Sequence, residues 1–177
     1  TDLQTAISDL EVVQKDTQSN LYFIEYQLEA SSEKITIATT RPETMMGDTA
    51  IAVNPKDKRY TNIVGKNVKI PIVNRSIKII TDHHADPEQG SGAVKITPAH
   101  DFNDYIVGKR NNLEIINIFE KDGKINLNGI KDFVGLDRFE ARKLIVDKLK
   151  ESGHLIKIEQ INNKVPYGDR SNTIIEP

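Results

Sequence analysis

The stretch of sequence that decides the fold is Gly92-Ala93-Val94-Lys95-Ile96-Thr97-Pro98-Ala99-His100-Asp101-Phe102-Asn103-Asp104-Tyr105. It leaves one secondary-structure element and opens the next. We expect Val94 and Ile96 to face the core while Lys95 and Thr97 point the other way. Asp101 follows at the start of a helix, where its carboxylate is suited to cap free N–H groups. Side chains and free backbone N–H groups can converge on a ligand at such a junction, so the stretch predicts a site.

A second stretch of the same kind is Thr39-Thr40-Arg41-Pro42-Glu43-Thr44. Pro42 ends the preceding strand because proline cannot donate to a β-ladder. Taken alone, the hexapeptide favours a plain strand end followed by a helical turn with Thr40 as its cap. The alternative is a pocket wall lined by hydroxyl groups beside the Arg41 guanidinium. Only the combination with residues 92–105, and the family pattern described below, favours the pocket.

Strand-forming runs are spread along the whole chain. They cover residues 21–28, 34–40, 49–53, 68–74, 76–81, 115–119, 155–160 and 173–176. A hairpin turn is expected at residues 29–33. One helix is expected from Asp101 to about Asn111. A second is expected from Asp137, with Glu140 at the spacing of a capping box, to Gly153. Many short strands with few helices predict a mainly β, α+β fold: a closed β-barrel with helices on its rim.

Length and composition limit the class of protein. A chain of 177 residues is expected to form a single domain, residues 1–177. It has no cysteine and no apolar run near the roughly 20 residues that span a bilayer, so we expect a cytoplasmic location and no membrane partner. The first residues show no signal peptide and no initiator methionine, and the chain is expected to be a piece of something longer. Its net charge of −2 predicts weak binding of RNA by this domain alone.

Four further segments complete a family pattern, at residues 3–12, 116–119, 135–143 and 166–171. Together with the two stretches above, they resemble the editing (connective-polypeptide) domain of valyl-tRNA synthetase, a class I aminoacyl-tRNA synthetase. The resemblance covers essentially the whole chain. It implies an aminoacyl-tRNA deacylase within a valine–tRNA ligase, which hydrolyses the ester of mischarged threonyl-tRNA(Val). The implied partners are the tRNA(Val) acceptor end carrying threonine and the catalytic domain of the parent synthetase.

The resemblance also implies the site residues. Asp104 is expected to anchor the α-amino group of the aminoacyl moiety. Lys95 and Arg41 are expected to supply positive charge to the terminal nucleotide or to the oxyanion, and which does which is open. The expected catalytic set is Asp104, Lys95, Arg41 and Thr44. The expected substrate-binding set is Thr39, Thr40, Glu43, Thr97, His100 and Asp101.

No cofactor or metal is expected for this domain. His83 and His84 with Asp86 form a possible ligand group, but it lacks further ligands at matched spacing, which favours a surface turn. The full-length synthetase would use ATP and Mg²⁺, yet nothing in the chain resembles the ATP-binding signatures. His100 has no serine or cysteine partner, so a catalytic triad is not expected.

Other functions remain open from the sequence. One is an isoleucyl-type or leucyl-type editing domain, although Arg41 and the run from Lys95 to His100 favour the valyl type. Another is a module that binds the tRNA acceptor end without hydrolysis. A third is a plain structural insert.

Overall fold

The computed structural model describes the backbone of residues 13–167 and the side chains of residues 19–162. The described strands are β1 (Val13–Leu28), β2 (Lys34–Thr39), β3 (Ala50–Val53), β4 (Asn67–Lys69), β5 (Ser76–Thr81), β6 (Val94–Ile96) and β7 (Leu155–Tyr167). The described helices are α2 (Phe102–Arg110) and α3 (Arg138–Glu151), with short 3-10 helices η1 (Pro42–Gly47), η2 (Thr61–Ile63) and η3 (Lys131–Phe133). Across residues 13–167, no helix combines the length and the apolar character that crossing a bilayer requires. With seven strands and two α-helices among the described residues, the predicted strand-rich α+β class is confirmed.

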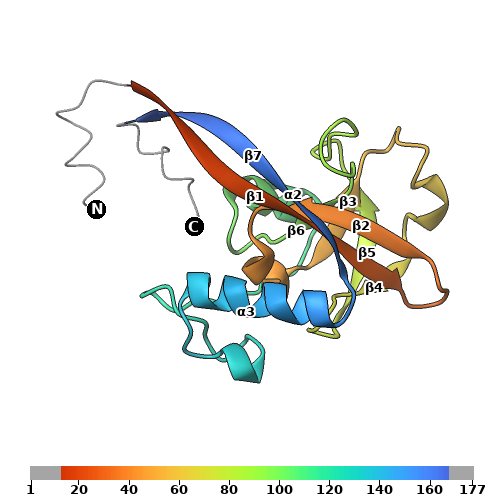
Figure 1. Cartoon of the computed structure of the whole chain (residues 1–177). Coiled ribbons are helices and arrows are strands. Elements are labelled where there is room, and N and C mark those ends of the chain that lie inside the picture. Colours follow the sequence, from red (N-terminus) through yellow and green to blue (C-terminus); the bar gives the residue numbers. More distant parts are fainter. Residues whose placement is uncertain (1–12, 168–177) are drawn as a thin grey trace.

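All seven described strands belong to one sheet, in the order β2-β1-β4-β5-β3-β6, with β7 paired to β1 outside this path. The long strand β1 pairs antiparallel with β2, β4 and β7. Only β3 and β5 run parallel among the described pairs. The two longest strands, β1 and β7, come from opposite ends of the chain and lie side by side as a twisted ribbon (Figure 1).

The sheet curls until its two end strands, β2 and β6, contact each other. Within the described residues these two strands form no ladder, and the approach is bridged by the Ser91 hydroxyl, which donates to the carbonyl oxygen of Thr36 at 2.5 Å. The barrel is thus nearly closed, where the sequence predicted a closed one. A gap without a ladder leaves room for side chains from both end strands.

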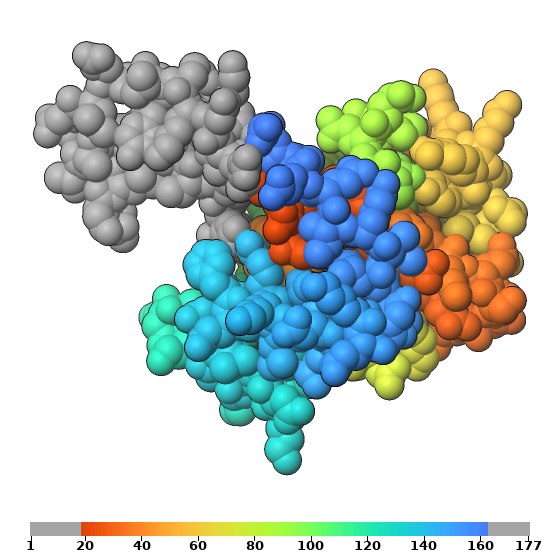
Figure 2. All heavy atoms as spheres, viewed as in Figure 1, coloured from red at the N-terminus to blue at the C-terminus, as the bar shows by residue number. Residues whose placement is uncertain are grey.

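The core fills the inside of this curled sheet. Alternate residues of β1, namely Ile24, Tyr26 and Leu28, are buried on one face, as the two-residue period of a strand requires. Helix α3 adds Ala141, Ile145 and Leu149, which share one helical face, and it packs against η1. Fully burying each of the larger aliphatic side chains stabilises the fold by roughly 1.5–3 kcal/mol. In the space-filling view, α3 and β7 form much of the front face (Figure 2).

Both predicted helices are confirmed, together with their caps. Asp101 caps α2 by accepting a hydrogen bond from the N–H of Asp104 at 2.9 Å. Asp137 and Glu140 form the capping box of α3. The hairpin turn at residues 29–33 is also confirmed, because β1 and β2 pair directly across it.

Two strand predictions are wrong in whole or in part. Residues 115–119 form no strand and contribute only one bridge, Phe119 to Ile125, because the N–H of Ile118 donates to the His100 ring instead of to a ladder. The run at 68–74 keeps strand geometry only to Lys69. It ends in a tight turn in which Ile72 has a φ of 68° and the N–H of Val73 donates to the carbonyl of Pro71 at 2.6 Å. The strand predicted at 173–176 lies outside the described residues.

A buried ion pair fastens α3 to η1, and breaking it should destabilise the fold. Arg142 donates two hydrogen bonds, at 2.7 and 2.8 Å, to the fully buried carboxylate of Glu43. Arg142→Met should lower the free energy of unfolding by about 3 kcal/mol and the melting temperature by roughly 6–12 °C, since a buried charge then loses its main partner.

The control is Lys143→Met, which removes an exposed cation from the same helix. The double variant Glu43→Gln/Arg142→Met should recover much of the loss, because it removes the stranded charge as well. Thermal melting of all three variants checks this expectation. If Arg142→Met melts like the wild type, the ion pair contributes nothing to stability.

Candidate active site

A pocket of about 390 Å³ opens where the end of β2, strand β6 and the start of α2 meet. Eight of the ten predicted site residues line it: Thr39, Thr40, Arg41, Thr44, Lys95, Thr97, Asp101 and Asp104. The remaining lining residues are Leu21, Ala38, His84, Gln89 and Val94. The two sequence stretches singled out above therefore line the same cavity. It lies at the gap that the nearly closed barrel leaves between β2 and β6.

The threonine-rich wall follows from the way β2 ends. Pro42 stands at the first turn of η1, and Arg41 occupies the N-cap, where the sequence suggested Thr40. The N–H of Arg41 donates to the Thr39 hydroxyl at 3.0 Å, and the Thr44 hydroxyl donates to the carbonyl of Arg41 at 2.9 Å. Strand end and helical turn are thus both present, as the plain structural interpretation held, and they carry hydroxyl groups to the pocket.

Two of the lining residues, Lys95 and Thr97, belong to a buried polar cluster around Asp48, a residue that the sequence analysis missed. Lys95 Nζ lies 2.6 Å from Asp48 Oδ1, and the Thr97 hydroxyl donates to the same oxygen at 2.8 Å. The Tyr26 hydroxyl donates to Asp48 Oδ2 at 2.6 Å. Lys95 also hydrogen-bonds to the Thr97 hydroxyl. The sequence signal for Asp48 was its position as an acidic residue directly after the apolar pair Met45-Met46 and Gly47.

Burial governs the protonation chemistry of this cluster. Burial raises the pKa of Asp48, although the Lys95 charge and the hydrogen bonds from Lys95, Tyr26 and Thr97 oppose that rise. Burial and the Asp48 carboxylate together raise the pKa of Tyr26 well above its usual range. We take Asp48 and Lys95 as an ion pair, because three donors converge on a carboxylate whose two oxygens are both engaged. Lys95 therefore reaches the pocket with its charge already matched.

Asp104 links the end of β6 to α2 at the pocket edge. Its Oδ2 accepts the N–H of Thr97 at 2.9 Å. Its Oδ1 lies 3.5 Å from Nε2 of His84. The Asp104 side chain remains 13% exposed, so the carboxylate touches both the protein and the cavity. Asp101 serves as the helix cap, as predicted, and Asp104 is the third residue of α2, where its carboxylate lines the pocket.

Glu43 and His100 are the two predicted residues that do not line this pocket. Glu43 is turned toward Arg142 of α3 and also lies 3.9 Å from Arg41 Nε. The His100 ring accepts the N–H of Ile118 at its Nε2, while the His100 carbonyl accepts from Arg41 at 2.5 Å. His100 lines a neighbouring cavity of about 520 Å³ instead, with Phe119 and Arg138 among its other walls.

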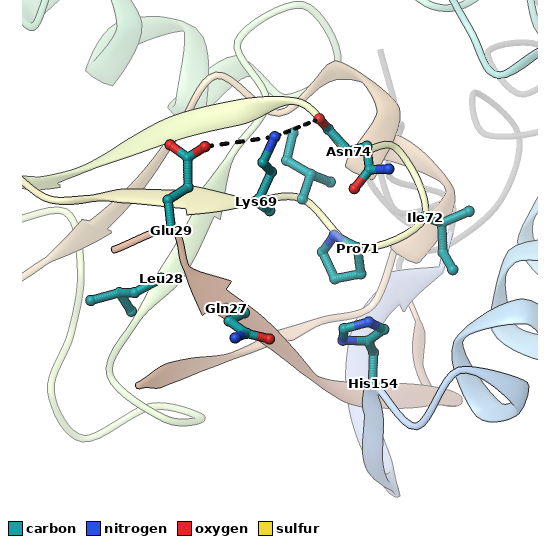
Figure 3. Close-up of a pocket in the computed structure, with 9 residues that line it drawn as sticks. Gln27, Leu28, Glu29, Lys69, Pro71, Ile72, Asn74 and His154 are labelled. Carbon is teal, nitrogen blue, oxygen red and sulfur yellow. Dashed lines mark hydrogen bonds and ion pairs between the residues drawn. The ribbon is translucent and has the colours of Figure 1, made fainter. Parts of the chain in front are cut away.

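A third cavity, of about 340 Å³, is shown in Figure 3. It is lined by Gln27, Leu28, Glu29, Lys69, Ile70, Pro71, Ile72, Asn74 and His154. Lys69 lies 3.6 Å from Glu29 and donates to the carbonyl of Asn74 at 3.4 Å. This cavity contains none of the predicted site residues. Among the side chains that the structure describes, residues 19–162, no three His, Cys, Asp or Glu are grouped as a metal site requires.

The comparisons with known proteins point to aminoacyl-tRNA synthetases. No family model matches the chain. It is 67% identical over 175 residues, 99% of its length, to a valine–tRNA ligase from Pelagibacter ubique. It is 54% identical over 98% of its length to the valine–tRNA ligase of Lactococcus lactis, and 52% identical over 98% to that of Synechocystis. The chain spans only 20%, 20% and 19% of the length of these three relatives.

Two solved structures with this fold are of leucyl-tRNA synthetases (LeuRS). One is the Agrobacterium radiobacter K84 LeuRS in a ternary complex with tRNA and LeuAMS, with a TM-score of 0.60 and 18% identity over 94% of this chain and 24% of that one. Another is GlLeuRS-CP1, with a TM-score of 0.62 and 13% identity over 78% of this chain and 99% of that one. At such low identity the likeness concerns the fold alone, which is that of a CP1 domain.

The buried His100 ring should make stability depend on pH. Burial first, and then the Arg41, Lys95 and Arg138 charges, lower the pKa of His100 to about 4. A folded-state pKa below the unfolded value means that the unfolded chain binds the extra proton between about pH 6.5 and 4. The neutral ring therefore contributes stability above pH 6.5 that is lost as the pH falls toward 4. The loss should be on the order of 2 kcal/mol by about pH 4.5.

Urea unfolding of the wild type, His100→Gln and His83→Gln at about pH 7 and 4.5 tests this. His83 is an exposed histidine and serves as the control. The pH-dependent loss should shrink in His100→Gln and stay unchanged in His83→Gln. Equal losses in all three proteins would contradict the prediction.

Proposed function

We propose that this chain, which belongs to the valyl-tRNA synthetases as one segment of their sequence and has the fold of a CP1 editing domain, hydrolyses the ester of threonyl-tRNA(Val). In this proposal residues 1–177 are a single editing domain of a larger synthetase that works in the cytoplasm. Its partners are the acceptor end of tRNA(Val) and the catalytic domain of the parent enzyme. The observation that carries the proposal is the convergence in one pocket of threonine side chains, the Asp104 carboxylate and Lys95, which the buried Asp48 holds in place.

An editing domain compensates for the limited ability of one apolar pocket to distinguish valine from threonine. Threonine and valine have nearly the same shape, and valyl-tRNA synthetase is itself the established example of an apolar pocket that rejects the added hydroxyl by only about 10²-fold. A second pocket that hydrogen-bonds the threonine hydroxyl selects threonine over valine. When valine enters such a pocket, the buried polar groups lose their partner, which is costly. Thr39, Thr40 and Thr44 line this pocket, and the hydroxyls of Thr39 and Thr44 each keep one hydrogen bond to the Arg41 backbone and further capacity for a ligand.

The proposed mechanism assigns each wall a task. Asp104 binds the substrate α-ammonium through Oδ1, a charge-assisted contact of roughly 1.5–3 kcal/mol. The ester is already activated, so positioning a water molecule and stabilising the oxyanion suffice. The water oxygen adds to the ester carbonyl, the bond to the terminal ribose oxygen breaks, and that oxygen takes up a proton. Arg41 and Lys95 provide the positive field for the oxyanion.

Asp48 enters this proposal as a positioning residue. It holds the Lys95 ammonium at 2.6 Å and the Thr97 hydroxyl at 2.8 Å. Both groups are thereby fixed before the substrate arrives, which lowers the cost of reorganisation during the reaction. Glu43 supports the site from behind through its contacts to Arg142 and Arg41.

A leucyl-type editing domain is the main alternative with this fold. The sequence identity favours the valyl type, since it is 67% to a valine–tRNA ligase and at most 18% to the two LeuRS structures. A module that binds the acceptor end without hydrolysis has no separate support in the pocket, and the first experiment below separates it from the enzyme.

Substrate preference is the first test of the proposed function. The chain should deacylate threonyl-tRNA(Val) faster than valyl-tRNA(Val) by about 10²-fold or more, because only threonine offers a hydroxyl that can hydrogen-bond to the polar wall. Release of radiolabelled amino acid from the two tRNAs under single-turnover conditions measures the ratio. Both substrates carry the same tRNA, which controls for RNA contacts. Equal rates, or no hydrolysis of either ester, would reject the editing function.

The second test concerns the ammonium anchor. Asp104→Asn keeps the size of the side chain and an acceptor for the Thr97 N–H but removes the charge. Deacylation of threonyl-tRNA(Val) should fall at least about 10-fold, while the melting temperature changes little. The control is Asp147→Asn, which removes an exposed carboxylate from α3. If Asp104 only supports the helix terminus, the variant costs about 0.3–1 kcal/mol of stability and hydrolysis is spared.

A further inference from the structure

His84 faces the same carboxylate oxygen that the proposed ligand needs. Of the two oxygens of Asp104, Oδ2 is engaged by the N–H of Thr97. The other, Oδ1, lies 3.5 Å from His84 Nε2. His84 is one of the residues that line the pocket, and its side chain is 30% exposed. A ligand ammonium that approaches Oδ1 therefore meets the imidazole.

The turn that carries His84 is fixed to both ends of α2. The His84 N–H donates to Asp82 Oδ1 at 2.8 Å. Asp82 is in turn held by two hydrogen bonds from Arg110, at 3.0 and 2.8 Å, and by one from Asn111 at 2.9 Å. These residues stand at the C-terminal end of α2, whereas Asp104 stands in its first turn. The imidazole is therefore placed by the fold and does not depend on a ligand.

Charged groups around the pocket influence the protonation state of His84. Arg41 and Lys95 bring two positive charges to the pocket lining, and Asp101 and Asp104 bring two negative ones, while Lys95 is also paired with the buried Asp48. The groups that face the imidazole are Asp104 and Asp101 on α2 and Asp82 on its own turn, and all three raise the pKa of His84. The hydrogen bond to Asp104 is the largest of these effects, against the opposing effect of burial.

We propose that His84 is a pH-dependent positioning residue of this pocket: as a cation it occupies Asp104 Oδ1, and as a neutral imidazole it leaves that oxygen to the ammonium group of the ligand. Ligand binding then weakens as the pH falls, because the protein must release one proton from His84 first. The effect is linked to a single proton, so it reaches at most about tenfold per pH unit below the pKa of His84. This inference rests on the proposed function for the class of ligand, an aminoacyl adenosine with a free α-ammonium.

His83 provides a matched control for the experiment. It is the neighbouring histidine, it is exposed, and it does not line the pocket. The probe is an adenosine that carries threonine at its 3′ position through an amide, which cannot be hydrolysed like the ester. Calorimetry measures its Kd for the wild type, His84→Gln and His83→Gln at about pH 6 and about pH 8.5. The α-amino group of the probe also titrates in this range, but it does so equally for all three proteins.

The inference predicts a ratio of affinities that depends on pH. At about pH 6 His84→Gln should bind the probe several-fold more tightly than the wild type, and at about pH 8.5 the two should agree. His83→Gln should match the wild type at both values. A ratio that does not change with pH, the same change in His83→Gln, or failure of the wild type to bind the probe at about pH 8.5 overturns the inference.

An NMR titration of the His84 ring gives a readout that a merely structural role would not move. Saturating probe should lower the midpoint of His84, as should Asp104→Asn, and an unchanged midpoint in both overturns the inference. These measurements do not require catalysis. If the chain binds the probe with the expected pH dependence but hydrolyses no aminoacyl-tRNA, the proposed hydrolysis fails while the role of His84 stands.

Discussion

The ion pair between Asp48 and Lys95 is the interaction on which the site and its surroundings depend. The two charged atoms lie 2.6 Å apart, and both side chains are buried. Withdrawing two charges from water costs several kcal/mol per ion, and their attraction offsets this only when further hydrogen bonds satisfy the remaining lone pairs. The Thr97 and Tyr26 hydroxyls meet that condition for the carboxylate. The pair is therefore stable only as part of the whole cluster.

The same cluster ties together parts of the sheet that are not neighbours in it. Tyr26 belongs to β1, Lys95 belongs to β6, and the strand order separates β1 from β6 by three strands. Arg75 adds the edge of β5 by donating to the carbonyls of Asp48 and Met46, at 2.7 and 2.8 Å. The nearly closed barrel is thus held across its interior by polar contacts at the point where its end strands leave a gap. This gap is where the pocket opens.

Local sequence rules were sufficient for the helices, whereas the two walls of the site were predicted with the help of the family resemblance. Asp101 and Asp137 specify their helix starts through side-chain caps, which depend only on residues within one turn. The same rules failed for residues 115–119, because the partner of the Ile118 N–H is His100, a residue 18 positions away in the chain. An apolar run predicts burial but does not identify its hydrogen-bond partner.

Asp48 and His84 were missed for the same reason, since their contacts to Lys95 and Asp104 each span at least 20 residues of sequence. Glu43 lies inside the threonine-rich stretch, yet a 3-10 turn directs it to α3, 99 residues further on. The family resemblance therefore predicted which segments meet, whereas the direction of each side chain required the fold.

The distribution of charge separates recognition of the amino acid from recognition of RNA. Lys95 is matched by Asp48, and Arg41 lies 3.9 Å from Glu43, so the pocket's cations have acids close by. Asp104 keeps one oxygen toward the cavity, which suits a cationic group and not a phosphate. The whole chain carries a net charge of −2, and binding to a phosphate backbone depends on an excess of positive charge. In the proposed function, this pocket therefore selects the aminoacyl group, and the affinity for tRNA has to come mainly from the remainder of the synthetase.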